Sequence, residues 1–319
     1  MKTLTLAAAA SALLGTTALA ADVQTRTVTF ENEGSTLAGT LYLPSDYQSG
    51  DKLPAVVVTG AWTSVEEQMP ATYAREMVER GFAAFTFDFR GWGKSGDLPE
   101  HTRFVESPEA KTSDIRKAID YVATLPEVDA SQINGLGICA SAGYMVDAVS
   151  GNPLVQRLGL VAPWLQNAEL VETVYGGAEG VEGLIGVSRT AEAAGGEIIP
   201  AAGPEGAEGV LMPIGGYYYE AERGAIPEYD NKWNNASWEG WLTYHPADNP
   251  ERLDKPLAMV HSESAAIPDG VRSFLNGLAG DATMQWLEDV TQFDFYDNPD
   301  DVERAADTVA EHFRAGTKS

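Results

Sequence analysis

Two nucleophilic side chains, Cys139 and Ser141, stand within one short segment of the chain. The sequence there reads Gly-x-Cys-x-Ser and follows an apolar run at residues 133–138 that is typical of a buried strand. A nucleophile on a sharp strand-to-helix turn needs small neighbours, because bulky side chains at the flanking positions would collide. The spacing therefore predicts a nucleophile raised at the end of a strand, and Cys139 fits the raised position.

Two other interpretations of this segment stay open. Ser141 also stands in a nucleophile frame, although Cys139 then occupies the position where a first glycine is preferred. Cys139 is also the single cysteine of the chain, and it can be a small buried side chain without a chemical role. If the thiol is the nucleophile, we expect the N-terminus of the following helix to lower its pKa.

Strand-like and helix-like patterns alternate along most of the chain. Strand composition occurs in eight apolar runs, at residues 23–30, 37–43, 55–59, 82–87, 133–138, 158–161, 257–261 and 284–287. Helical periodicity separates several of them, as at residues 115–123, where Ser113 is the expected N-cap, and it also ends the chain at residues 302–313. Such alternation predicts an α/β fold with a mostly parallel central sheet and helices on both faces.

The segment from residue 163 to 246 interrupts this alternation. It is rich in glycine, and its aromatic residues include Tyr217, Tyr218, Tyr219, Trp233, Trp238 and Trp241. Because it lies between two expected core strands, we predict an inserted cap over one end of the sheet, with a core of residues 21–162 and 247–319. The cap aromatics either wall an apolar pocket or pack the cap itself.

The first twenty residues have the pattern of a secretory signal peptide, with Lys2, a short alanine-rich apolar stretch and Ala-Leu-Ala before Ala21. We expect cleavage after Ala20 and a product in the periplasm or outside the cell. The stretch is too short and too rich in alanine for a membrane anchor. An exported chain with one thiol forms no internal disulfide, so its stability must come from packing.

The net charge of the chain excludes some partners. The 319 residues include 21 basic and 47 acidic ones, which gives a formal charge of −26 at pH 7. Such a charge is repelled by phosphate backbones and by anionic lipids, so neither nucleic acid nor a membrane is expected as a partner. The sequence leaves the oligomeric state open.

Five segments together resemble the α/β-hydrolase superfamily, and within it the dienelactone hydrolase-like group with a Gly-x-Cys-x-Ser-x-Gly-Tyr elbow. They are residues 59–69, 87–96, 137–144, 261–263 and 291–297. The resemblance covers nearly the whole chain after the signal. It implies an oxyanion hole built from the backbone N–H of Ala140 and one near Trp62. It implies no cofactor and no metal.

This chain departs from the family at both proton-transfer positions. Gln292 stands where the resemblance implies a histidine, and Ala265 stands where it implies the acid. Glutamine cannot accept a proton, so the implied triad is incomplete. A cysteine that is already partly ionised tolerates this loss better than a serine does.

A substitute base has to come from the four histidines. His261 follows the strand expected at 257–261, and Glu263 stands two residues on, where it can orient or charge the ring. We hypothesise that His261 or Glu263 assists Cys139; the alternative is that His261 only hydrogen-bonds loop backbone. Nothing in their spacing selects the remaining histidines, His101, His245 and His312.

Acidic residues near the C-terminus lack the spacing of a cation site. Asp297, Asp300 and Asp301 do not alternate as metal ligands do, and they fit the N-terminus of the last helix.

These observations predict an exported, cofactor-free hydrolase that cleaves an ester, thioester or lactone through Cys139. The substrate would be a small molecule with an apolar or aromatic portion. Two alternatives remain: a catalytically degenerate α/β-hydrolase that acts as a periplasmic binding protein, and an acyltransferase.

Overall fold

The computed structural model describes residues 23–97 and 102–315. The predicted signal peptide, residues 1–20, and His101 lie outside this part of the chain. Within it, no helix is both long enough and apolar enough to cross a membrane.

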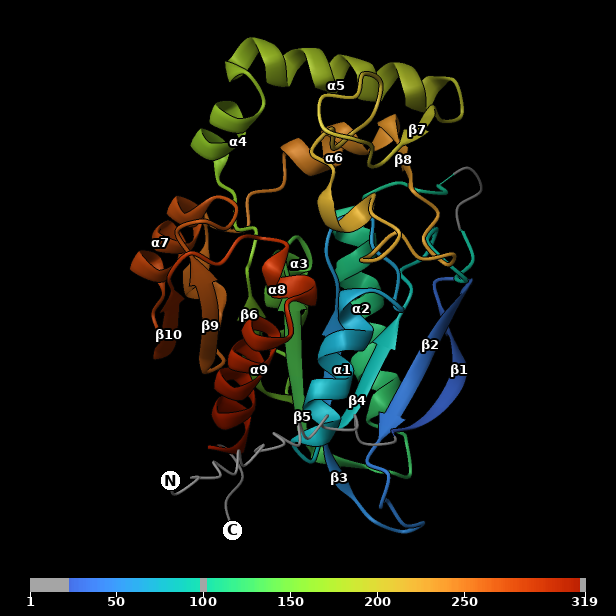
Figure 1. The fold of residues 1–319 in the computed structure, drawn as a ribbon, viewed down its shortest axis with the longest axis vertical. Helices are drawn as coiled ribbons and strands as arrows, with labels where there is room; N and C mark the ends of the chain where they lie inside the picture. Colours follow the sequence, from blue (N-terminus) through green and yellow to red (C-terminus); the bar gives the residue numbers. More distant parts are fainter. Residues whose placement is uncertain (1–22, 98–101, 316–319) are drawn as a thin grey trace, which may run out of the picture.

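Eight strands form the central sheet, in the order β1-β2-β4-β3-β5-β6-β9-β10 (Figure 1). They are β1 (Gln24–Asn32), β2 (Ser35–Leu43), β3 (Leu53–Thr59), β4 (Ala83–Phe87), β5 (Val128–Ile138), β6 (Val155–Val161), β9 (Leu257–Ser262) and β10 (Ala282–Leu287). The pairs β1–β2 and β2–β4 are antiparallel, and the other neighbouring strands are parallel. This confirms the predicted α/β fold.

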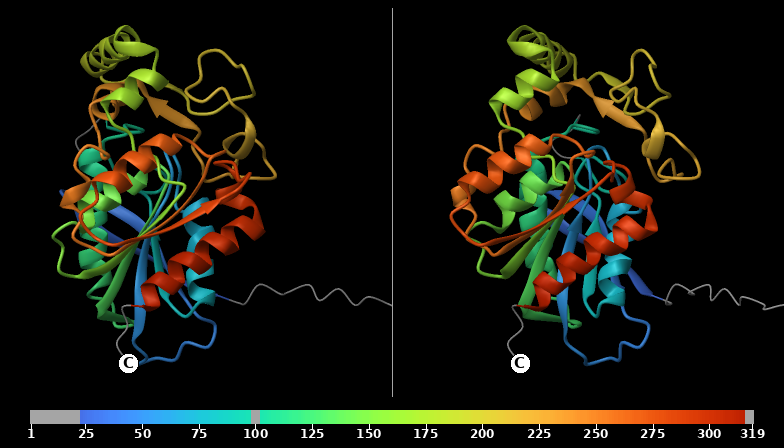
Figure 2. Two further views of the ribbon diagram at one scale, coloured as in Figure 1. Left: turned by 90° about the vertical axis from the view of Figure 1, so that its left-hand side faces the viewer. Right: turned by 60° about the vertical axis from the view of Figure 1, so that its left-hand side comes forward.

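Helices cover both faces of the sheet (Figure 2). On one face α1 (Met69–Glu79) and α9 (Pro299–Arg314) contact each other and the strands; on the other, α2 (Pro108–Val122) packs against α3 (Ser141–Val149). The two helices α7 (Pro268–Gly277) and α8 (Asp294–Asp297) follow β9 and β10 in the sequence. In α9 the expected apolar stripe is buried: Val302, Ala305, Ala306, Val309, Ala310 and Phe313.

One predicted helix start is wrong. The helix assigned an N-cap at Ser113 begins at Pro108, and Ser107 is its cap, accepting a hydrogen bond from Ala110 N. Apolar periodicity begins only at Ile115, so it missed the first turns, which the proline at the helix start would have indicated. For α9 the cap is Asn298, which accepts from the N–H groups of the acidic first turn.

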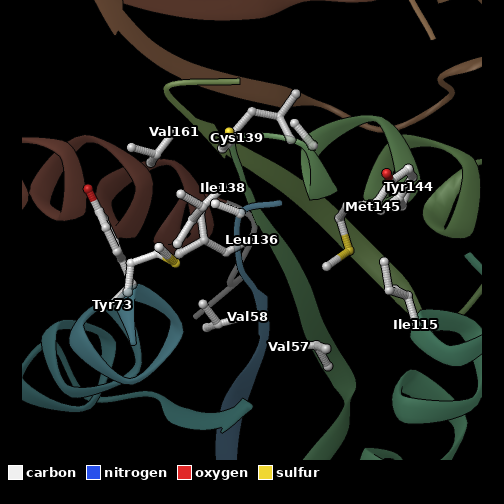
Figure 3. Packing of buried hydrophobic residues seen from close by; sticks show 14 of the residues in the cluster. Val57, Val58, Tyr73, Ile115, Leu136, Ile138, Cys139, Tyr144, Met145 and Val161 are labelled. Carbon is white, nitrogen blue, oxygen red and sulfur yellow. The ribbon is translucent and has the colours of Figure 1, made fainter. Parts of the chain in front are cut away.

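The strand β5 lies at the centre of the sheet between β3 and β6, with Thr59 opposite Gly137 and Ile138 opposite Val161. Its last six residues are buried because neighbouring strands and helices cover both faces. Figure 3 shows the side chain of Cys139 beyond the end of this strand, next to Val161. The register therefore sets Cys139 at the carboxyl edge of the sheet, where open α/β sheets bind ligands.

The chain between β6 and β9 lies over this edge (Figures 1 and 2). It contains α4 (Ala168–Val174), α5 (Gly177–Ala193), β7 (Ile198–Pro200), η1 (Gly216–Tyr218), β8 (Lys232–Asn234), η2 (Asn235–Ser237), α6 (Trp238–Leu242) and η3 (Pro250–Arg252). Trp62, from the loop after β3, packs against Trp233 and Trp241 of this segment, with ring centroids 4.6 and 4.8 Å apart. The segment is therefore joined to the core by aromatic packing beside the elbow.

Candidate active site

The turn between β5 and α3 holds Cys139 in a left-handed backbone conformation, with φ at +56°. A non-glycine residue in this region carries about 1–3 kcal/mol of strain. Backbone hydrogen bonds retain it: Cys139 N donates to Val161 O at 3.1 Å, while Ala142 N and Trp164 N donate to Cys139 O at 3.1 and 2.9 Å. This backbone conformation directs the Cys139 side chain toward the cavity described below.

Glycines at positions 137 and 143 allow α3 to lie close to the end of β5 and to the cap. A Cβ atom added to Gly137 would lie 2.9 Å from Ala142 Cα, and one added to Gly143 would lie 2.9 Å from Pro246 Cβ. Both distances are shorter than carbon atoms tolerate. The spacing of small residues in the sequence thus reflects close packing of strand, helix and cap.

Ser141 is directed into the turn and away from the cavity. Its hydroxyl group accepts hydrogen bonds from Thr59 Oγ1 at 2.9 Å and Ile138 N at 3.2 Å, and lies 3.1 Å from Ile138 O. The residue is 1% exposed and does not line the cavity described below. The structure therefore presents Cys139, and not Ser141, to the cavity.

Three groups that can donate a hydrogen bond lie close to the Cys139 sulfur: the backbone N–H groups of Ala140 and Trp62 and the hydroxyl group of Tyr296. The two N–H groups are those that the family resemblance implies for an oxyanion hole. Burial nevertheless raises the pKa of the Cys139 thiol, and the three donors lower it without compensating fully. The prediction of a lowered pKa is therefore wrong, because loss of hydration outweighs the helix N-terminus.

Cys139 opens into a cavity of about 510 Å³ between the sheet edge and the cap. Core residues that line it are Trp62, Cys139, Ala140, Trp164, Ser264, Ala265, Ala266, Thr291, Gln292, Phe293 and Tyr296, and cap residues are Val174, Tyr175, Leu211, Met212, Pro213, Ile214, Tyr218 and Trp241. These residues, all in the described part of the chain, include no acidic, basic or histidine side chain. The cavity is therefore suited to an uncharged, apolar molecule.

Comparison with known proteins agrees with this geometry. The family model of the dienelactone hydrolase family matches residues 37–164. The crystal structure of the Pseudomonas aeruginosa protein PA2218 superposes with a TM-score of 0.80 at 27% identity, over 92% of this chain and 94% of that one. This chain has the α/β-hydrolase fold. A structure of DcsB with a substrate analogue has the same fold, with a TM-score of 0.73 at 19% identity over 92% of this chain and 99% of that one.

Sequence comparison matches relatives to this chain over shorter segments than the structural superpositions cover. PA2218 is 42% identical over 141 residues, which are 44% of this chain and 37% of that protein. A polyketide transferase of Penicillium crustosum, claH, is 31% identical over 37% of each chain. A protein named thiohydrolase from Eupenicillium brefeldianum is 30% identical over 37% of this chain and 36% of its own. The chain thus spans well under half the length of these relatives.

The chain carries Gln292 and Ala265 on the wall of the cavity that Cys139 also lines. Gln292 Nε2 donates to Ala162 O and to Tyr296 Oη, both at 2.9 Å, and Gln292 Oε1 accepts from Ala266 N at 3.0 Å. Both residues therefore stand where the resemblance implies a base and an acid, and neither side chain can transfer a proton.

The structure does not bring His261 and Glu263 to Cys139. His261 is fully buried, packs against Trp286 with ring centroids 5.4 Å apart, and is not part of the cavity wall. Burial lowers its pKa to about 4, against the opposite effect of the Ala266 backbone. The Glu263 side chain is 59% exposed and pairs with Arg272. The hypothesis of their assistance is thus not supported by position.

The other described histidines also lie outside the cavity wall. His245 Nε2 is 3.0 Å from Leu242 O, and His312 Nε2 is 3.1 Å from Pro256 O. His245 therefore binds backbone at the end of α6, and His312 binds backbone just before β9.

Sequence reasoning missed Tyr296, which contacts the sulfur, although it stands four residues after Gln292, a spacing that brings two side chains together on a helical turn. It also missed a buried triad behind the elbow. Lys111 Nζ lies 2.8 Å from Glu106 Oε2, and the Tyr144 hydroxyl donates to Glu106 Oε1 at 2.8 Å. Burial lowers the pKa of Lys111, and Glu106 opposes that effect.

Carboxylates support the loop that carries Trp62. Glu66 N donates to Asp88 Oδ1 at 2.8 Å, and the Glu66 carboxylate accepts from Thr40 and Thr86. Oxygens of Glu66, Glu67 and Asp88 lie within 4.8 Å of one another, close enough to hold a metal ion, and Lys94 Nζ contacts Glu67. We assign the cluster to loop support, because each of the three carboxylates accepts from a group of the chain through at least one oxygen.

Glu66 makes stability depend on pH. Burial, helped by the charge of Asp88, raises its pKa to about 7 from 4.5, so the folded state binds more protons between these values. The free energy of unfolding then falls as pH rises through this window. We expect Glu66→Gln, relative to wild type, to gain about 2–3 kcal/mol between pH 5 and pH 8. Urea unfolding with EDTA present measures this; the exposed Glu79→Gln is the control, and parallel curves for Glu66→Gln would contradict it.

Proposed function

We propose that this chain forms an acyl-enzyme on Cys139 with a small, apolar ester, thioester or lactone. The observation that carries the proposal is the convergence of two backbone N–H groups, from Ala140 and Trp62, on a sulfur that opens into an uncharged cavity. Such donors stabilise the oxygen of a tetrahedral intermediate, and loss of one costs about 3–4 kcal/mol in comparable sites.

The chemistry requires no group beyond those present. The Cys139 sulfur attacks the carbonyl carbon, a C–S bond forms, and the carbonyl electron pair moves to the oxygen held by Ala140 N–H and Trp62 N–H. The thiol proton passes to water; when the intermediate collapses, the bond to the leaving group breaks, and the departed anion takes up a proton from water. Water then cleaves the acyl-cysteine to a carboxylic acid and regenerates the thiol.

The cavity wall favours a thioester among these substrates. No residue of the wall has an acid or base that titrates near neutrality, so an alkoxide would have to leave without a proton. A thiolate is far less basic and leaves unaided. The relatives named thiohydrolase and polyketide transferase agree with this choice.

The cap supplies the apolar binding surface. Val174 and Ile214, which line the cavity, are 43% and 55% exposed, and Tyr175 and Trp241 lie further in, joined by a hydrogen bond of 2.7 Å. Apolar side chains that stay in contact with water at a cavity wall gain most when an apolar acyl chain covers them.

A second function, acyl transfer, is favoured by Gln292. A histidine in this place would activate water, whereas glutamine leaves the acyl-cysteine to whichever nucleophile enters the cavity. Slow hydrolysis and fast transfer to a small thiol or amine would identify a transferase.

We also propose, from residues 1–20, that the chain is exported.

Intact-mass measurement after incubation with acyl thioesters tests the proposal directly, because Cys139 is the chain's single cysteine. We expect the mass of one acyl group on wild type and none on Cys139→Ala. Ser141→Ala is the matched control: it should still form the adduct while losing about 1–3 kcal/mol of stability. An adduct on folded Cys139→Ala, or binding without any adduct on wild type, would refute the acyl-enzyme.

Restoring the missing groups should speed deacylation. We expect Gln292→His combined with Ala265→Asp to shorten the lifetime of the acyl-cysteine by about a hundredfold or more, because general base catalysis contributes that much. Each single variant should show a smaller effect. The lifetime is read by quenching the adduct and weighing the protein at intervals; an unchanged lifetime in a folded double variant would contradict this assignment of the two positions.

A further inference from the structure

Tyr296, on α8, has its hydroxyl group close to the Cys139 sulfur. The residue is 1% exposed, and its ring is packed against Tyr217, Tyr218 and Phe293. Its hydroxyl group also hydrogen-bonds to Tyr218 and accepts from Gln292 Nε2 at 2.9 Å. The position of this hydroxyl group is therefore fixed on every side.

The hydrogen bond from Gln292 determines the direction in which the Tyr296 hydroxyl group can donate its proton. The Ala162 carbonyl can only accept and the Ala266 N–H can only donate, so the amide of Gln292 must turn Nε2 toward Ala162 and Oε1 toward Ala266. Nε2 then also donates to Tyr296 Oη. A phenol has one proton of its own, and it must be donated elsewhere.

The Cys139 sulfur lies on the same cavity wall as Tyr296, and it is the acceptor that becomes negatively charged in the proposed reaction. The contact with Tyr296 lowers the pKa of the Cys139 thiol and raises that of Tyr296, as expected when the phenol donates to a thiolate. Tyr218 is the other hydroxyl-bearing residue in contact with Tyr296. Burial keeps the pKa of Tyr296 well above its ordinary value, which excludes it as a base near neutrality.

We propose that Tyr296 is a catalytic hydrogen-bond donor to the Cys139 thiolate and that Gln292 is the positioning residue that aims it. This inference rests on the proposed acyl-enzyme function. Tyr296 keeps its proton throughout the reaction: the thiol proton passes to water, and the phenol offsets part of the cost of a buried thiolate. Glutamine at the histidine position thus supports the nucleophile instead of accepting its proton.

The pH dependence of Cys139 alkylation by iodoacetamide tests the inference without any acyl substrate. In Tyr296→Phe the ring stays and only the donor is lost, so the midpoint of the rate profile should move to higher pH. Each unit of that shift should slow alkylation below the midpoint by about threefold, since a more basic thiolate is also more nucleophilic. A loosened cavity would instead raise the rate at every pH without moving the midpoint.

Two further variants complete the test. Gln292→Met keeps the phenol but removes the N–H that orients it, and should move the midpoint in the same direction by less. Tyr229→Phe removes a buried hydroxyl group that is not part of this cavity wall and whose partner is Thr63, and should leave the midpoint in place. Unchanged midpoints in both Tyr296→Phe and Gln292→Met would overturn the inference even if acyl adducts form. Wild-type thiol that alkylates but never acylates would instead defeat the proposed function.

Discussion

The left-handed backbone at Cys139 is the constraint around which the rest of the site is arranged. It costs about 1–3 kcal/mol, and it persists because β6 and the loop after it hold the turn through Val161 and Trp164. Glycine at 137 and 143 lets the strand, the elbow helix and the cap approach closely enough to make those bonds. The same turn that raises the sulfur brings Ala140 N–H beside it.

Burial of that sulfur sets the chemical problem that its neighbours address. Removing a thiolate from water disfavours it, and Glu106, held by Lys111 and Tyr144 behind the elbow, disfavours it further. Two backbone N–H groups and one phenol act in the opposite direction. The balance leaves the pKa raised, so the resting state is a protonated thiol, and reactivity depends on how well the donors hold the charge once it forms.

Sequence patterns were sufficient for the fold and for the centre of the site. Alternating apolar runs gave the parallel sheet, and small residues around Cys139 gave the turn, because both depend on local spacing. The resemblance also indicated that four residues lie near the nucleophile, and they line the same cavity: Gln292, Ala265, Trp62 and Ala140. The spacing favoured Cys139 but left Ser141 open, because which of the two faces the cavity depends on the direction of the side chains within the turn.

Other features could not be predicted because they depend on long-range contacts. His261 does end its strand at the expected edge, but Trp286 from the next strand covers it. The pKa of the Cys139 thiol is raised, whereas the sequence predicted a lowered pKa, because the sequence does not show how deeply the sulfur is buried. Tyr296 becomes important only when α8 is set against the elbow.

The most direct test of the acyl-enzyme is a crystal structure of the protein after reaction with a slowly released acyl thioester. The account predicts continuous density from Cys139 Sγ into the cavity, with the acyl oxygen within hydrogen-bond distance of both Trp62 N and Ala140 N. Crystals that take up the thioester but leave the sulfur unmodified, or an acyl oxygen turned away from both N–H groups, would contradict it.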